Sequence, residues 1–315
     1  MIDRGPTPDR LAGRLPGGAA VVATSIVLAW NGRADTLDCL TALAGQAVPG
    51  VEHRLVLVDN GSADDTPAAV RAAFPDVEIL ALPENLGYAR GMNAGLRHVL
   101  PAGPDWTLLV NNDAFAAPGL LAALLAAADA ADVGLLAPTI YHLDPPGRVW
   151  PSAGRRSRLT LAARDTTARP PTRAPYDVDW ATGCCLLVRR AVWDEVGLFD
   201  PRYHFYYEDH DLCLRVRAAG WRIRHVPAAT AHHRVAGSTG VGSPRQAYLL
   251  GRASVRFYLD HTRGAQRGFI LVYRLGSLVH TLARAFAHGR PAAGVAYLHG
   301  LRDGIDDVRR GGTRT

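Results

Sequence analysis

Apolar runs alternate with helical patterns along the first 130 residues. VVATSIVLAW (21–30) is continuously apolar, as in a strand buried on both faces of a parallel sheet. Three more strands are expected at HRLVLVDNGS (53–62), VEILAL (77–82) and DWTLLVNNDAF (105–115). Between and after them, helical patterns cover 34–45, 62–74, 85–100 (entered from a loop) and 118–130. This alternation predicts an α/β fold, an open and mostly parallel sheet with helices on both faces.

The remainder of the chain is less regular. The Pro- and Arg-rich stretch 140–180 predicts a long, partly mobile loop. After it, the patterns predict a strand and a short helix within 178–200, a helix over 208–219, a strand over 221–230 and an amphipathic helix over 269–289. We therefore divide the chain into a disordered leader (1–19), an α/β domain (20–240) and a helical appendage (241–315).

Composition adds a charge asymmetry to this division. The chain has 315 residues, is 48% hydrophobic and has a net charge of +6. Residues 241–315 contain 12 Arg and 4 acidic residues, a net +8, whereas residues 1–240 contain 23 Arg and 25 acidic residues, a net −2. A basic appendage on a near-neutral body is typical of a segment that binds an anionic surface. An equally weighted alternative is that the charges only solvate an exposed helical face.

Cysteine usage and hydropathy indicate the compartment. The spacing of Cys39, Cys184, Cys185 and Cys213 does not suit a zinc cluster, so we expect reduced, buried thiols in a cytoplasmic protein. Residues 1–19 do not resemble a signal peptide. Every apolar run of membrane-spanning length contains an arginine, so we expect no segment to cross a bilayer.

Candidate ligand-binding residues follow the predicted strands. The strand ends WNGR, VDNGS, PENLGY and NNDAF are all polar, and ligands of open α/β sheets bind beyond the carboxyl ends of the strands. The Asp59 carboxylate can accept hydrogen bonds from a base edge or a ribose hydroxyl, or it can simply form an Asx-type turn. In ENLGYARGMNAGL (84–96), Gly87 and Gly91 allow close backbone approach to phosphate, and Arg90 can add a charge-assisted contact.

Two further groups of residues could bind a metal cation and supply a catalytic base. Asn111, Asn112 and Asp113 offer one carboxylate and amide oxygens for a hard divalent cation, and a later histidine, His232 or His233, could complete the site; a strand-end turn and structural histidines are the alternatives. FYYEDHDLCLR (205–215) places Glu208, Asp209 and Asp211 at the start of a helix. These acids either cap that helix or supply a catalytic base.

Six segments together resemble a known family. SIVLAWNG, VDNGSADDT, NLGYARGMNAG, LLVNNDAF, the stretch from TGCCLLVRR to VRAAGW, and HHRVAGSTG occur in this order. They are similar to bacterial family 2 glycosyltransferases with the GT-A fold, in the rhamnosyltransferase-like branch. The likeness covers about residues 22–240, and GLRDGIDDVRRG (300–311) resembles the tail of that branch.

The resemblance implies an inverting sugar transfer from a nucleotide-diphosphate donor to an acceptor hydroxyl, with Mg²⁺ or Mn²⁺. It favours dTDP-L-rhamnose and leaves a UDP-sugar open as donor. Asp59 matches the residue that reads the nucleobase, Asp113 the metal-binding acid, here in an NND sequence, and His233 the late metal or diphosphate ligand. Domain 20–240 would then be the catalytic domain.

The acid pair takes its expected role from the same resemblance. Asp209 is assigned as general base, and Glu208 is either the alternative base or a ligand of the acceptor hydroxyl. His210 departs from the family pattern, which often has a hydrophobic residue there. The residues expected to bind the donor nucleotide are Trp30, Asn31, Asp59, Asn60, Asn85, Gly87, Arg90, Asn93 and Asn112. Those expected to bind the acceptor are Trp180, Thr182, Gly183 and Glu208.

Two other function classes are kept as alternatives. A sugar-nucleotidyltransferase would need a Gly-rich, basic first loop, which AWNGRADT does not supply. A non-catalytic nucleotide-sugar binding relative would bind the donor without turnover. A saccharide, a lipid-linked saccharide or a secondary metabolite all fit as acceptor. We expect no nucleic-acid partner. Peripheral contact of the basic segment with the inner face of the membrane and a homodimer are both left open.

Overall fold

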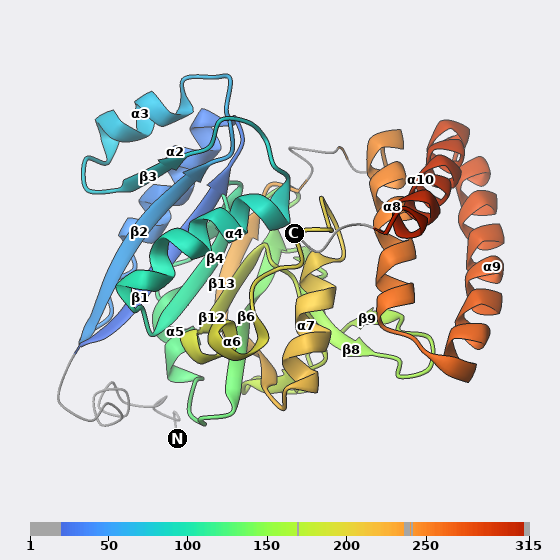
Figure 1. The fold of residues 1–315 in the computed structure, drawn as a ribbon. Helices are drawn as coiled ribbons and strands as arrows, with labels where there is room; N and C mark the ends of the chain where they lie inside the picture. The colour runs from blue at the N-terminus through green and yellow to red at the C-terminus, as the bar shows by residue number, and fades with distance from the viewer. Residues whose placement is uncertain (1–19, 169, 236–239, 241, 312–315) are drawn as a thin grey trace.

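A mixed β-sheet forms the centre of the protein (Figure 1), for which a computed structural model describes residues 20–168, 170–235, 240 and 242–311. The expected leader 1–19 lies outside these residues. The main path of the sheet runs in the order β10-β13-β6-β12-β4-β1-β2-β3. These strands are Tyr176–Val178, Arg222–His233, Val133–His142, Cys185–Arg189, Trp106–Asn111, Val21–Ala29, Val51–Asp59 and Glu78–Ala81.

Strand directions confirm the expected α/β class. β1 pairs in parallel with β2 and β4, β2 with β3, and β13 with β6. β12 runs antiparallel between β4 and β6. The order β4-β1-β2-β3 means that the chain leaves β1 toward β2 on one side and returns as β4 on the other. This is a topological switch point, where open α/β sheets form a crevice beyond the carboxyl ends of the strands.

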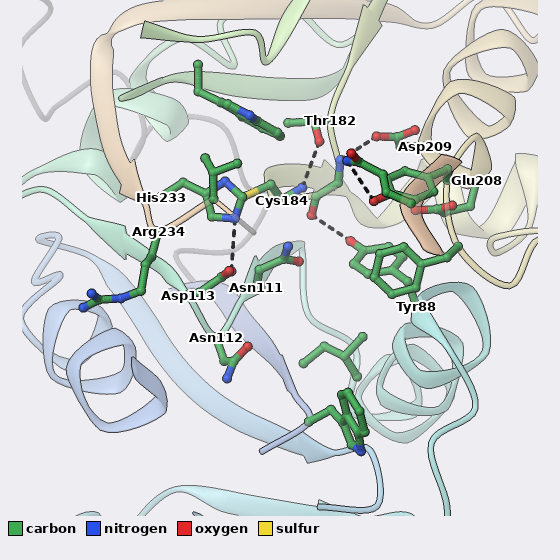
Figure 2. Close-up of a pocket in the computed structure, with 18 of the residues that line it drawn as sticks. Tyr88, Asn111, Asn112, Asp113, Thr182, Cys184, Glu208, Asp209, His233 and Arg234 are labelled. Atoms are coloured by element: carbon green, nitrogen blue, oxygen red, sulfur yellow. Dashed lines mark hydrogen bonds and ion pairs between the residues drawn. The ribbon is translucent and has the colours of Figure 1, made fainter. Parts of the chain in front are cut away.

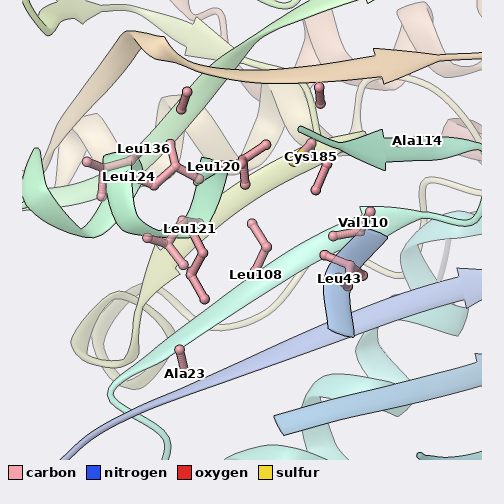
Figure 3. Close-up of a cluster of buried hydrophobic side chains, with 14 of the residues drawn as sticks. Ala23, Leu43, Leu108, Val110, Ala114, Leu120, Leu121, Leu124, Leu136 and Cys185 are labelled. Carbon is pink, nitrogen blue, oxygen red and sulfur yellow. The ribbon is translucent and has the colours of Figure 1, made fainter. Parts of the chain in front are cut away.

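Helices cover both faces of the sheet and bury a separate apolar cluster on each. One face carries α2 (Arg33–Ala44), α3 (Thr66–Ala73) and α5 (Leu120–Ala126). Figure 3 shows this cluster, where Leu120, Leu121 and Leu124 lie over Leu108 and Leu136 of the sheet. The other face carries α4 (Tyr88–Val99), α6 (Arg190–Val196) and α7 (Glu208–Ala218). Apolar side chains on both faces explain why the central strands are continuously apolar.

Three parts of the chain differ from the sequence expectations. Val133–His142 is a long strand, β6, between the ranges expected as helix and loop. The expected strand 105–115 divides, because after β4 the chain turns into β5 (Ala114–Ala116), which pairs with β13. The segment 140–180 holds strands of only two to four residues, too short to show an alternating pattern. They are β7 (Val149–Trp150), β8 (Ala153–Arg156), β9 (Ala163–Asp165), β10 and β11 (Trp180–Ala181).

Three helices follow the sheet: α8 (Pro244–Asp260), α9 (Gly264–Ala287) and α10 (Pro291–Arg309). α8 is capped by Ser243, whose hydroxyl accepts a hydrogen bond from the Gln246 N–H at 3.0 Å. It packs closely on α10, since a Cβ on Gly300 would lie only 2.1 Å from the Tyr248 carbonyl oxygen. It also contacts the body through the rings of Tyr207 and Phe257, whose centroids are 4.9 Å apart.

α9 lies on the outside of this group (Figure 1). Its 24 residues are long and apolar enough to cross a membrane by length and composition, although only 6% of its most apolar window is buried. The expectation that no segment could cross a bilayer rested on arginine in every apolar run. α9 has the length and hydropathy of a spanning helix although it contains Arg274. One arginine in an apolar run therefore does not by itself exclude a spanning helix.

Candidate active site

The polar ends of the four N-terminal strands and the start of α7 meet at one cavity of about 1240 Å³. Figure 2 shows Asp113 and His233 on one side of it and Glu208 and Asp209 on another. Of the residues predicted from the sequence, those that line the cavity are Trp30, Asn60, Asn85, Asn112, Asp113, Trp180, Thr182, Gly183, Glu208, Asp209 and His233. The cavity lies at the sheet edge where the switch point predicts it.

Asp113 and His233 are brought together by strand pairing across 120 residues. Asp113 occupies the turn between β4 and β5, and β5 pairs antiparallel with the end of β13, placing Ala114 opposite His233. The His233 Nε2 and Asp113 Oδ1 atoms are 3.1 Å apart. The Trp150 ring lies edge-on to the His233 ring at 4.9 Å between centroids, which fixes the imidazole orientation.

This pair fits a divalent cation that is shared with a ligand. A carboxylate oxygen and an imidazole nitrogen are donors that Mn²⁺ accepts, and Mg²⁺ takes the carboxylate. Among the described residues, no group of three or more His, Cys, Asp or Glu side chains is arranged to hold a metal. A cation at Asp113 and His233 would therefore take its remaining ligands from diphosphate oxygens and water.

The backbone before α7 holds Asp209 at the cavity. Tyr206 and Tyr207 have φ angles of 69° and 68°, a left-handed conformation that costs non-glycine residues about 1 kcal/mol or more each. The resulting turn starts α7 directly at Glu208. Asp209 Oδ2 accepts a hydrogen bond from the Gly183 N–H at 3.3 Å, and Oδ1 accepts one from the His210 N–H at 2.7 Å.

Glu208 differs from Asp209 in its surroundings. It is only 7% exposed, and its Oε2 atom has no hydrogen-bond partner among the described residues. Burial, assisted by the neighbouring charge of Asp209, raises the pKa of Glu208 well above its ordinary value. The surroundings of Glu208 therefore disfavour its charged form more than those of a solvent-exposed carboxylate would.

His210 and Asp211 have structural partners. His210 Nδ1 accepts a hydrogen bond from Arg156 Nη2 at 2.6 Å, and burial lowers the pKa of His210 to about 4, so the imidazole is neutral. Asp211 accepts hydrogen bonds from Arg215 Nε and from His261 Nε2, both at 2.8 Å. The N-cap residue Tyr207 makes no side-chain cap. Asp209 instead accepts from the first-turn N–H of His210, so it satisfies a free helix N–H as well as facing the cavity.

Five predicted donor-binding residues do not line the cavity: Asn31, Asp59, Gly87, Arg90 and Asn93. Asp59 Oδ1 accepts a hydrogen bond from the Ser62 N–H at 3.1 Å, which is the Asx-type turn considered as its alternative role. The Asn93 amide bonds both the N–H and the carbonyl of Phe199. Arg90 Nε donates to the Pro201 carbonyl at 3.1 Å. Their placement fits support of the cavity wall, and direct donor contact stays a prediction.

Asn60, which lines the cavity, and Asn31, which does not, both hold the strand-end loops together. The Asn60 amide bonds the Leu86 N–H and the Gly87 carbonyl, which holds the third strand-end loop against the second. Asn31 accepts a hydrogen bond from the Ala63 N–H at 2.8 Å and has a φ of 58°. The strand-end loops are thus fixed to one another before any ligand arrives, which reduces the entropy lost on binding.

Gly87 provides a stability prediction. Gly87 and Gly197 share φ 79° and ψ 179°, a conformation nearly exclusive to glycine. A Cβ at Gly87 would lie 2.5 Å from the His204 carbonyl oxygen, whereas one at Gly197 would meet no atom within 4 Å. We expect Gly87→Ala to be less stable than Gly197→Ala by about 2 kcal/mol, the cost of the backbone shift. Thermal unfolding of both variants measures this, and equal losses would contradict it.

Several cavity residues escaped prediction. His142, Arg148 and Trp150 come from the β6–β7 hairpin, and Arg245 and Gln246 come from the first turn of α8. The Pro-Gly pair in DPPGRVW was an available turn signal for the hairpin. Ser243, Pro244 and Gln246 were an available signal for the start of α8, but not for its contact with the cavity. Residues 236–239 of the HHRVAGSTG segment lie outside the described residues.

Comparison with known proteins connects this geometry to a family. A profile described as "Glycosyltransferase like family 2" matches residues 21–248, more than half of the chain. The chain is 37% identical over 213 residues to an N-acetylglucosaminyl-diphospho-decaprenol L-rhamnosyltransferase of Mycobacterium tuberculosis (strain CDC 1551 / Oshkosh). That match covers 59% of this chain and 68% of the relative.

Solved structures share the fold. The mannosyltransferase PcManGT from Pyrobaculum calidifontis, in complex with GDP-Man and Mn²⁺, has a TM-score of 0.54 at 18% identity, covering 97% of this chain and 85% of that one. GalNAc-T7, solved with UDP, GalNAc and Mn²⁺, has a TM-score of 0.58 at 14% identity, covering 76% of this chain and 50% of that one. These likenesses show the expected GT-A fold. The profile match over residues 21–248 shows that this chain belongs to the family 2 glycosyltransferases.

Proposed function

We propose that the protein moves a sugar from a nucleotide-diphosphate donor to an acceptor hydroxyl with inversion, using Mg²⁺ or Mn²⁺ and Asp209 as general base. The observation that carries this proposal is the single cavity lined by both the Asp113–His233 pair and Asp209. A cation site and a base on different sides of one cavity suit an in-line displacement at the anomeric carbon.

The base acts on the acceptor. Asp209 takes the proton of the acceptor hydroxyl as the new C–O bond forms, on the side of the sugar opposite the departing diphosphate. The Gly183 N–H bond at 3.3 Å orients the carboxylate toward the wall formed by Trp180 and Thr182, where the acceptor would lie. Glu208, whose charged form is disfavoured by burial, contributes a hydrogen bond to an acceptor hydroxyl and leaves the proton to Asp209.

The departing diphosphate needs positive charge. A cation held by Asp113 and His233 supplies Lewis-acid neutralisation of its oxygens when bound. Arg148 and Arg245 also line the cavity, and neither forms an ion pair with a described residue. Their guanidinium groups can bind phosphate oxygens directly. Arg234, by contrast, is paired with Asp35 at 2.7 Å.

We infer that the donor sugar is L-rhamnose, carried by dTDP. The support is the 37% identity to an L-rhamnosyltransferase over 213 residues. A UDP-sugar is the second candidate, because Trp30 at the cavity rim, 37% exposed, can stack on any nucleobase.

Thermal shift with nucleotide sugars tests this assignment. A ligand present at a hundred times its dissociation constant stabilises the native state by about 2.7 kcal/mol, which raises the Tm by roughly 5 °C. We expect dTDP-L-rhamnose with Mn²⁺ to give a larger shift than UDP-glucose or GDP-mannose. A larger shift with a UDP-sugar would replace the donor assignment. Binding without donor hydrolysis or transfer to any acceptor would indicate a non-catalytic relative.

A further inference from the structure

One face of α9 is apolar and exposed. Ten of the twelve exposed large apolar side chains among the described residues lie on α9 and α10, seven of them on α9. Val272, Leu275, Val279 and Phe286 are 70%, 64%, 68% and 61% exposed. Their spacing of three, four and seven residues places them along a single stripe of the helix. Exposed apolar surface of this extent marks an interaction site.

The opposite face of α9 is anchored to soluble helices. Ile270 is 1% exposed, in a cluster with Phe257 of α8. Arg274 Nη2 donates to the Ser254 hydroxyl of α8 at 3.0 Å and to the Tyr297 hydroxyl of α10 at 2.6 Å. A helix crossing a bilayer would have to break these bonds and leave α8 and α10. The anchored face therefore favours a helix that lies along the membrane surface.

Charge identifies the surface that the stripe fits. Residues 261–300 contain five arginines and no aspartate or glutamate. Arg263 and Arg267 lie at the start of α9, and Arg284 and Arg290 lie at and beyond its end, all four exposed. None of the four forms an ion pair with a described residue. Exposed apolar side chains between two cationic ends match an anionic lipid surface, where headgroups meet the arginines and acyl chains meet the stripe.

The same charges oppose a second copy of the chain on this face. In a two-fold dimer through α9, an antiparallel arrangement places the Arg263 end of one helix against the Arg290 end of the other. A parallel arrangement places identical ends together. Both arrangements bring like charges together without an acidic residue in 261–300 to separate them.

We propose that α9 docks the protein on an anionic bilayer, with the Val272–Phe286 stripe inserted at the headgroup boundary and α8 facing the protein body. This inference rests on α9, its flanking arginines and its contacts with α8 and α10, so it stands or falls separately from the proposed donor and base.

Vesicle co-sedimentation of the full-length protein tests the proposal. We expect binding to vesicles of phosphatidylcholine with one-third phosphatidylglycerol at low salt, and at least tenfold weaker binding to pure phosphatidylcholine or in about 1 M salt. Val272→Glu/Val279→Glu should abolish binding, and an unchanged Tm would show that this variant is folded. Arg263→Gln/Arg284→Gln should lower the partition coefficient by about tenfold or more, whereas Arg71→Gln/Arg97→Gln, exposed on α3 and α4, should not.

Three results would overturn the proposal. The first is vesicle binding that survives Val272→Glu/Val279→Glu. The second is a dimer, measured by light scattering, that this double variant converts to a monomer while the wild type ignores vesicles. The third is resistance of the membrane-bound protein to alkaline carbonate extraction, which would indicate a spanning helix.

Discussion

Asp209→Asn is expected to lower the rate of sugar transfer by about a thousandfold while nucleoside-diphosphate affinity stays near that of the wild type. General bases contribute roughly 10² to 10⁴ in rate, and an amide cannot accept the proton of the acceptor hydroxyl. The amide can keep the hydrogen bond from the Gly183 N–H through its oxygen, so the wall around it should stay in place. Transfer kinetics and diphosphate titration on the same preparation separate the two effects.

Glu208→Gln is the matched comparison one residue away. Because burial disfavours the charged form of Glu208, an uncharged amide of the same shape suits this position, and we expect a much smaller loss of transfer. The variant also carries a pH signature. The pKa of Glu208 is raised above its ordinary value of 4.5, so the native state keeps a proton that the unfolded state releases. Stability from this group is present below that value and is lost as pH rises through the native pKa.

Glu208→Gln should abolish this part of the fall in the free energy of unfolding as the pH rises. Thermal unfolding across the pH range measures it in both proteins. If Asp209→Asn kept near wild-type transfer while Glu208→Gln lost it, the base would be Glu208 and the roles of the two acids would be exchanged.

Asp113→Asn is expected to abolish the metal-dependent part of nucleoside-diphosphate binding and to lower transfer by at least about a hundredfold. Neutralising the diphosphate with a cation is worth several kcal/mol in the transition state, and one factor of ten in rate corresponds to about 1.4 kcal/mol. The amide oxygen is a weaker cation ligand than the carboxylate. Thermal shift with dTDP, with and without Mn²⁺, gives the binding readout independently of turnover.

Two adjacent histidines supply the control for this site. His233→Gln should reproduce the loss seen with Asp113→Asn, because His233 Nε2 lies 3.1 Å from Asp113 Oδ1. His232→Gln should keep metal-dependent binding, because His232 packs on Tyr141 outside the cavity lining. Equal losses in the two histidine variants, or a Mn²⁺-dependent shift that survives Asp113→Asn, would remove the assigned cation site.

Local patterns sufficed for part of the fold. The strands at 21–30 and 53–62 and the helix at 208–219 follow from apolar runs and turn residues, and the four polar strand ends did meet at one cavity. β6 was missed because VGLLAPTIYH is apolar without alternation and directly follows a helical pattern. Tertiary pairing with β12 and β13 makes it a central strand.

The candidate site was harder to predict than the sheet. Nothing local joins Asp113 to His233, since they meet only through the pairing of β5 with β13, and the family resemblance suggested the pair instead. Asn93 and Arg90 were expected at the donor because they follow a glycine-rich loop. Their hydrogen bonds to Phe199 and Pro201 depend on contacts more than a hundred residues away, which periodicity does not reveal.

The double attachment of α8 limits how the protein could be recombined with its relatives. Arg245 and Gln246 of this helix line the cavity, and Phe257 near its end stacks on Tyr207 just before the acid pair. A chimera joined near residue 240 would replace Arg245 and Gln246 of the cavity lining together with the C-terminal helices. Crossover after His261, which bonds Asp211, keeps these contacts within one parent, and the incoming α10 must then preserve a glycine at position 300 to pack against α8.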